Sequence, residues 1–133
     1  MDRIILSENH RRSISSSMMI IERMMTDIER ALLNPYDGVM SKTVNDIDDL
    51  DTNHFISVLK KMTEQISNLS NKYNLKTEEV KLSRIINSRK AKMWETIKDT
   101  SSRKLKGYGK FPVEFTEEFD KDIKNLLRLI ETL

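Results

Sequence analysis

Several residue types that build particular folds and sites are rare or missing in this sequence of 133 residues. It has no cysteine, which excludes disulfide bonds and thiolate metal sites. It has three glycines and two prolines, few for the turns of β-sandwiches and barrels or for glycine-rich nucleotide loops. Its histidines, His10 and His54, are too few for a multi-histidine metal site. We therefore expect no metal ion and no cofactor.

Long hydrophobic runs are also missing. The longest run, Met18-Met19-Ile20-Ile21, is far shorter than the roughly 20 residues of a membrane-spanning helix. Ile4-Ile5-Leu6 is shorter than the apolar stretch of about 7–15 residues in a secretory signal. The sequence therefore predicts a cytoplasmic protein without a membrane partner.

The common enzyme motifs are missing as well. No glutamate stands three residues before a histidine, as in di-iron bundles, and no serine occupies a nucleophile elbow. Asp46, Asp48 and Asp49 resemble calcium ligands, but the segment lacks the glycine and the terminal glutamate of an EF-hand. We therefore predict that the protein is not an enzyme.

The pattern that is present is helical. Apolar residues recur at alternating spacings of four and three, as in helices that pack side by side. The first such series is Ile14, Met18, Ile21, Met25, Ile28 and Leu32, and similar series follow in three later segments. We predict helices over approximately 8–33, 53–73, 78–105 and 117–132, with Thr77 and Thr116 as N-caps of the last two.

These helices predict an all-α fold, an up-and-down four-helix bundle in a single domain over residues 1–133. An irregular loop precedes the last helix and holds two of the three glycines. The residues in the middle of each heptad series should form the core of this bundle. They are Ile21, Met25, Leu59, Met62, Ile66, Met93, Ile123 and Leu126.

Lys90, Trp94 and Lys98 are a first candidate for partner binding, because a spacing of four places them on one face of the third helix. An exposed tryptophan between two cations suits an acidic or phosphate-bearing partner. The alternative is a tryptophan that covers the edge of the bundle beneath two lysine stems. Arg89, in the seam of the same helix, either reaches water or points into the bundle.

A second candidate is the loop Lys106-Gly107-Tyr108-Gly109-Lys110, with Arg103 and Lys104 just before it. Cations, an aromatic ring and glycine amides can hold a phosphate group or stack a base. The alternative is a helix C-cap followed by a turn. Residues 76–110 carry eleven Lys or Arg against four Asp or Glu, whereas residues 34–54 carry one against five.

The first helix is apolar over more than one stripe, and Ile4-Ile5-Leu6 forms an apolar arm before it. These features predict contact with several neighbouring helices or association with a second copy. We therefore predict a protein–protein interaction module, an adaptor subunit, regulator or inhibitor, that binds another protein or itself. The alternative is a nucleic-acid or nucleotide-binding accessory protein that uses the third helix and the Lys106–Lys110 loop.

Overall fold

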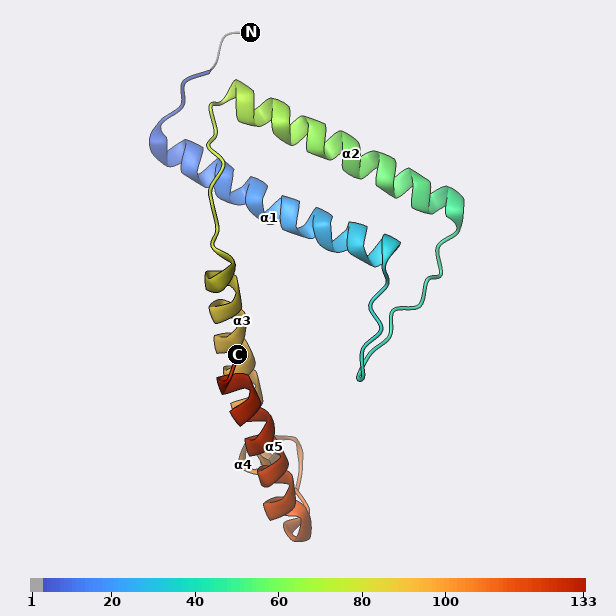
Figure 1. The fold of residues 1–133 in the computed structure, drawn as a ribbon, viewed down its shortest axis with the longest axis vertical. Coiled ribbons are helices and arrows are strands. Elements are labelled where there is room, and N and C mark those ends of the chain that lie inside the picture. Colours follow the sequence, from blue (N-terminus) through green and yellow to red (C-terminus); the bar gives the residue numbers. More distant parts are fainter. Residues whose placement is uncertain (1–3) are drawn as a thin grey trace. The chain divides into compact units, whose positions relative to one another are not determined.

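The computed structural model describes residues 4–133. Its helices are α1 (Glu8–Leu33), α2 (Asp49–Lys72), α3 (Leu82–Lys98), α4 (Ser102–Leu105) and α5 (Thr116–Glu131), with 3-10 turns at Lys106–Tyr108 and Val113–Phe115 (Figure 1). Helices make up 72% of residues 4–133, which contain no strand. The prediction of an all-α fold is confirmed.

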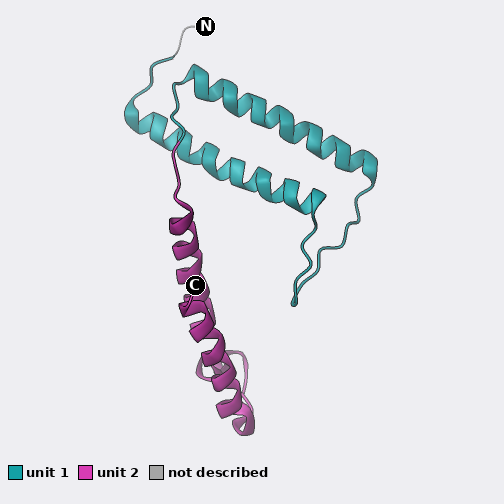
Figure 2. Ribbon diagram, viewed as in Figure 1, with its two compact units in different colours: residues 1–77 teal, residues 78–133 magenta. Residues whose placement is uncertain are grey.

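The chain divides into two compact units, unit 1 (Met1–Thr77) and unit 2 (Glu78–Leu133) (Figure 2). In unit 1, α1 and α2 form an antiparallel hairpin, and Ile4 N–H donates to the carbonyl of Lys72 at 2.8 Å. In unit 2, α3 packs against α5, and α4 contacts α5 as well. Each long helix therefore has one long partner within its own unit.

Side chains that satisfy backbone groups fix the ends of the hairpin of unit 1. Ser7 Oγ accepts the His10 N–H at 3.1 Å and caps α1, which ends before Pro35 as predicted. Asp48 caps α2 by accepting the Asp51 N–H at 2.8 Å, so α2 begins at Asp49 and not near residue 53 as predicted. The acidic run before α2 therefore stabilises that helix, because carboxylates interact favourably with the positive N-terminal end of a helix dipole.

The predicted third helix over residues 78–105 is shorter than expected at both ends. Thr77 does not cap it, because α3 begins at Leu82 after an extended segment. The heptad positions before Leu82 are glutamates, so no apolar side chain holds that turn against a neighbour. Near the other end, Ser101 caps a new helix by accepting the Lys104 N–H at 3.3 Å, which separates α4 from α3.

The core is smaller than the heptads predict. Met25, at 8% exposure, and Ile130, at 9%, are the buried hydrophobic residues among those described. The predicted core residues Ile21, Leu59, Ile66 and Ile123 are half-buried, whereas Met62, Met93 and Leu126 are exposed, contrary to prediction. A pair of helices has one shared seam, so apolar residues beside that seam stay in water.

Candidate protein-interaction surfaces

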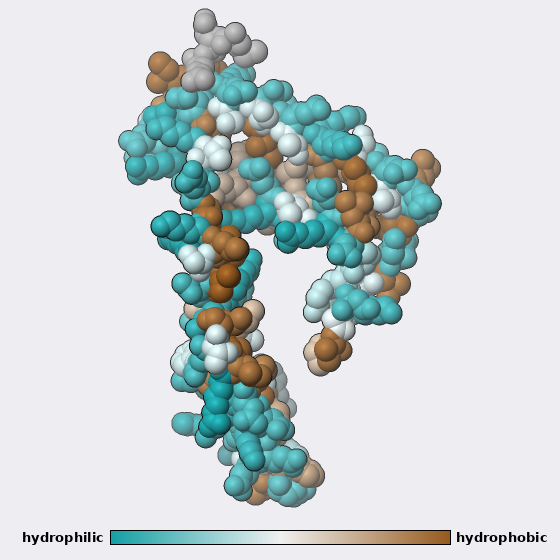
Figure 3. Space-filling model, in the orientation of Figure 1, coloured by the Kyte–Doolittle hydropathy of each residue, from teal (hydrophilic) through white to brown (hydrophobic). Residues whose placement is uncertain are grey.

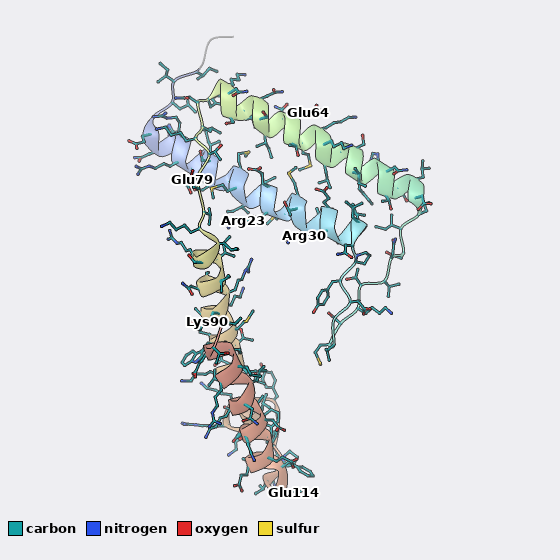
Figure 4. All side chains as sticks on the ribbon, in the orientation of Figure 1. Arg23, Arg30, Glu64, Glu79, Lys90 and Glu114 are labelled. Carbon is teal, nitrogen blue, oxygen red and sulfur yellow. The ribbon has the colours of Figure 1, made fainter. Side chains whose placement is uncertain are left out.

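Lys90, Trp94 and Lys98 share a face of α3, as predicted, and this face meets the last turn of α5. Figure 4 labels Lys90 where α3 and α5 lie side by side. Lys90 Nζ donates to the carbonyl oxygens of Glu131 at 2.9 Å and Leu133 at 3.0 Å. Trp94 Nε1 donates to Glu131 Oε1 at 3.3 Å, and Lys98 Nζ lies 4.2 Å from the centre of the Trp94 ring. Lys90 and Trp94 therefore hold the end of α5 in place, and Lys98 covers the Trp94 ring.

Replacing Lys90 with methionine is expected to lower the free energy of unfolding by about 0.5–1 kcal/mol, because a cation at a helix C-terminus stabilises its last carbonyls. Urea denaturation followed by Trp94 fluorescence measures the change. Lys92→Met, at an exposed position of the same helix, is the matched control and should stay within about 0.5 kcal/mol of wild type. Equal losses in the two variants would contradict a role for Lys90 at the end of α5.

The second candidate group lies on α4 and the turn that follows it. Arg103, Lys104, Lys106, Tyr108 and Lys110 are all exposed. Tyr108 is 92% exposed. Gly109 has a φ of 137°, a conformation that residues with a side chain rarely adopt. Gly107 and Tyr108 belong to a 3-10 turn. The structure thus leaves these side chains open to a partner.

One polar contact in unit 2 has no signal in the sequence. Asp120 of α5 accepts the Ser102 N–H at 2.9 Å through Oδ1 and the Ser102 hydroxyl at 2.7 Å through Oδ2. Ser102 is buried. The backbone bond, followed by the hydroxyl bond, holds the pKa of Asp120 below its ordinary value. This pair attaches the first residue of α4 to α5. It therefore also positions the segment that leads into the Lys106–Lys110 loop.

Replacing Asp120 with asparagine is expected to lower the melting temperature at pH 7. The folded pKa of Asp120 is below the unfolded one, so the ionised carboxylate stabilises the fold above the ordinary pKa of aspartate. This stabilisation is lost as the pH falls through the folded pKa, so the difference from wild type should shrink as the pH falls below about 4. Thermal melts across this range measure it, with Asp122→Asn as control. A constant difference at every pH would contradict the linkage.

The hairpin of unit 1 exposes apolar side chains on one of its faces. On α1, the exposed residues Ile20, Met24 and Ile28 lie on one side of Met25 when the helix is viewed along its axis. They are roughly 60–140° around the helix from Met25, in the direction opposite to the winding of the chain. On α2, a second exposed row consists of Phe55, Val58 and Met62. These residues lie roughly 40–100° around the helix from Leu59, again in the direction opposite to the winding of the chain. Because the two helices are antiparallel, rows displaced in the same sense lie on the same side of the hairpin.

The opposite side of this hairpin is mixed in character. It holds a hollow of about 140 Å³, lined by Glu22, Met25, Thr26, Glu29, Ile56, Leu59, Lys60 and Thr63. The outer edges are charged: Arg23 and Arg30 lie on the side of α1 away from α2, and Glu64 lies on the side of α2 away from α1 (Figure 4). Figure 3 shows hydrophobic atoms between the two helices and hydrophilic atoms along these edges. The exposed apolar rows thus have a polar rim.

Unit 2 repeats this organisation. On α3, Ile85, Ile86 and Met93 are exposed. Around the helix axis they lie to one side of the half-buried Ile97, in the direction opposite to the winding of the chain. On α5, the exposed residues Leu126 and Leu129 lie to the same side of the half-buried Ile123 around the helix axis. Arg89 lies among the α3 residues and is itself exposed, so of the two alternatives it reaches water. Unit 2 therefore has an apolar face with a cation in it.

The connection between α1 and α2 carries a further exposed apolar element. Gly38 N–H donates to the Ser41 carbonyl at 2.9 Å, and Asp37 and Lys42 form an isolated bridge. These contacts order a tight turn with Val39, 100% exposed, and Met40, 93% exposed, at its end. The tip of this loop is a hydrophobic end of unit 1 in Figure 3. The sequence did not single out this turn.

Residues 4–133 contain no cluster of three or more histidine or carboxylate side chains arranged to hold a metal ion. None of the helices in the described part of the chain has the length and hydrophobicity that a membrane span requires. Comparison with protein families, curated proteins and solved structures finds no match to this chain. The surfaces of the molecule therefore carry the functional argument.

Proposed function

We propose that this chain is a small non-enzymatic interaction module that binds another protein or a second copy of itself, as an adaptor subunit, regulator or inhibitor in the cytoplasm. The observation that carries the proposal is the row of exposed apolar side chains on one face of the α1–α2 pair and of the α3–α5 pair. Contiguous apolar surface with a polar rim is unfavourable in water and is typical of protein-binding sites. Several of these residues are methionines, which adapt to irregular partner surfaces.

An up-and-down four-helix bundle is the arrangement we propose for the bound state. Helices with apolar residues at alternating spacings of four and three bury them best against neighbours that cross at about 20°. The heptad series support this arrangement, because each gives its helix an apolar side that a single neighbouring helix leaves partly uncovered. In this proposal, the helices complete a bundle whenever a second apolar face covers the first.

Affinity capture from native host extract tests the proposed function. The comparison is between wild type, Met24→Lys on the apolar face of unit 1, Leu129→Lys on the apolar face of unit 2, and Met40→Lys at the tip of the α1–α2 connection. We expect mass spectrometry to identify a protein, or added tagged copies of this chain, retained by wild type and Met40→Lys and lost with a face variant. Capture that is equal for all four proteins would contradict the proposal.

The alternative function is nucleic-acid binding, which the exposed Tyr108 ring and its lysine neighbours favour. Fluorescence anisotropy with single- and double-stranded oligonucleotides at about 0.15 M salt separates the two functions. We expect dissociation constants no tighter than the nonspecific range of about 10⁻⁴–10⁻⁶ M. Tighter binding that weakens when Lys104, Lys106 and Lys110 become glutamine would support the alternative instead.

A further inference from the structure

We infer that unit 1 is a homodimerisation element, in which the apolar face of the α1–α2 hairpin packs against the same face of a second copy. This inference rests on the proposed function and names its partner. The contact joins Ile20, Met24 and Ile28 of α1 and the exposed row of α2 to their counterparts. Four long helices then enclose a shared apolar layer.

The composition of this face suits contact with an identical face. Between Ile20 and Ile28 on α1, and between Phe55 and Met62 on α2, the side chains within about 140° of the seam on this side are uncharged, and Asp27 and Lys61 lie at its outer edge. The charged residues of these stretches, such as Arg23 and Lys60, lie at the outer edge or on the opposite side. An isologous contact brings each apolar row onto another apolar row and leaves no charge without solvent.

The size of the face matches what a stable dimer needs. The 26 residues of α1 and the 24 residues of α2 give helices that are about 39 Å and 36 Å long. Two helices side by side, each about 10 Å wide, present a face on the order of 700 Å². A standard stable interface buries about 800 Å² on each partner, with an apolar centre and a polar rim.

The face of unit 2 is a poorer match for that of unit 1. Its helices have 17 and 16 residues, or about 26 Å and 24 Å, so a third of the longer face would stay uncovered. Arg89 also lies among its apolar residues. Placing that guanidinium against the uncharged centre of unit 1 would remove it from water without a partner, which is unfavourable. A second copy of unit 1 has neither defect.

Sedimentation velocity and light scattering on the purified full chain test the inference. We expect wild type to have twice the 15.6 kDa mass of one chain and a melting temperature that rises with protein concentration. Met24→Lys and Met62→Lys should each halve the mass. Met40→Lys and Leu129→Lys, which place the same charge at exposed positions outside this face, should remain dimeric. Far-ultraviolet circular dichroism checks that all four variants stay helical.

A wild-type mass of 15.6 kDa at every concentration would overturn the inference. So would a dimer that survives both Met24→Lys and Met62→Lys, because another surface would then hold it. If wild type is monomeric but Met24→Lys still loses a different protein from host extract, the homodimer fails and the proposed function stands. If neither self-association nor face-dependent capture occurs, both fail.

Discussion

Replacing Met25 with alanine is expected to destabilise unit 1 by about 2–4 kcal/mol, the range for truncating a long side chain in a core. Met25 is the buried hydrophobic residue of the described part of this unit, at 8% exposure, and it lies in the seam between α1 and α2. It also lines the hollow of about 140 Å³ on the polar side of the hairpin. Truncation therefore enlarges a space that already exists, and the surrounding side chains have little with which to fill it.

Chemical denaturation followed by circular dichroism at 222 nm measures this loss. Met40→Ala is the matched control, because Met40 is 93% exposed at the end of a turn and its truncation should change stability by no more than about 0.5 kcal/mol. A Met25→Ala variant as stable as Met40→Ala would show that the seam between α1 and α2 contributes little to folding. The position of α2 on α1 would then need another explanation.

Much of the helical structure could be predicted from local sequence alone. Ser7 before α1 and Pro35 after it mark the ends of a helix through hydrogen bonding and backbone geometry within a few residues. The same local chemistry explains the start of α2, where Asp48 is both a capping residue and part of the acidic run. Features of this kind depend on neighbours in the chain, so the sequence contains them.

The location of the core depends on which helices share a seam, and heptad spacing does not determine this. Met25 and Met62 occupy equivalent middle positions in their series, yet Met25 is buried and Met62 is 36% exposed. Spacing identifies the apolar side of a helix but not how many neighbours cover that side. A bundle would cover all of it, whereas a hairpin covers about half, and the uncovered half is the candidate binding face.

The candidate binding residues show the same limit. The spacing of Lys90, Trp94 and Lys98 correctly predicted that they share a face of α3. The partner of Lys90 and Trp94, however, is the end of α5, 37 or more residues away in the sequence. The Asp120–Ser102 pair spans 18 residues and had no sequence signal at all. Contacts between distant segments depend on the fold, which is why the sequence alone assigned these residues only as candidates.

Replacing Ile130 with alanine is expected to lower the stability of unit 2 by about 2–4 kcal/mol, through lost burial and the cavity that remains. Ile130 is 9% exposed near the end of α5, and the adjacent Glu131 accepts the hydrogen bond from Trp94. Loosening this turn should therefore also expose the only tryptophan, and its emission should shift to longer wavelength.

Leu129→Ala is the matched control, since Leu129 is adjacent in sequence but largely exposed, and it should change stability by no more than about 0.5 kcal/mol. If both variants unfold at the same urea concentration as wild type, the contact between α3 and α5 does not stabilise unit 2. An early transition in Ile130→Ala alone, seen by Trp94 fluorescence, would locate the core of this unit at the contact between the two helices.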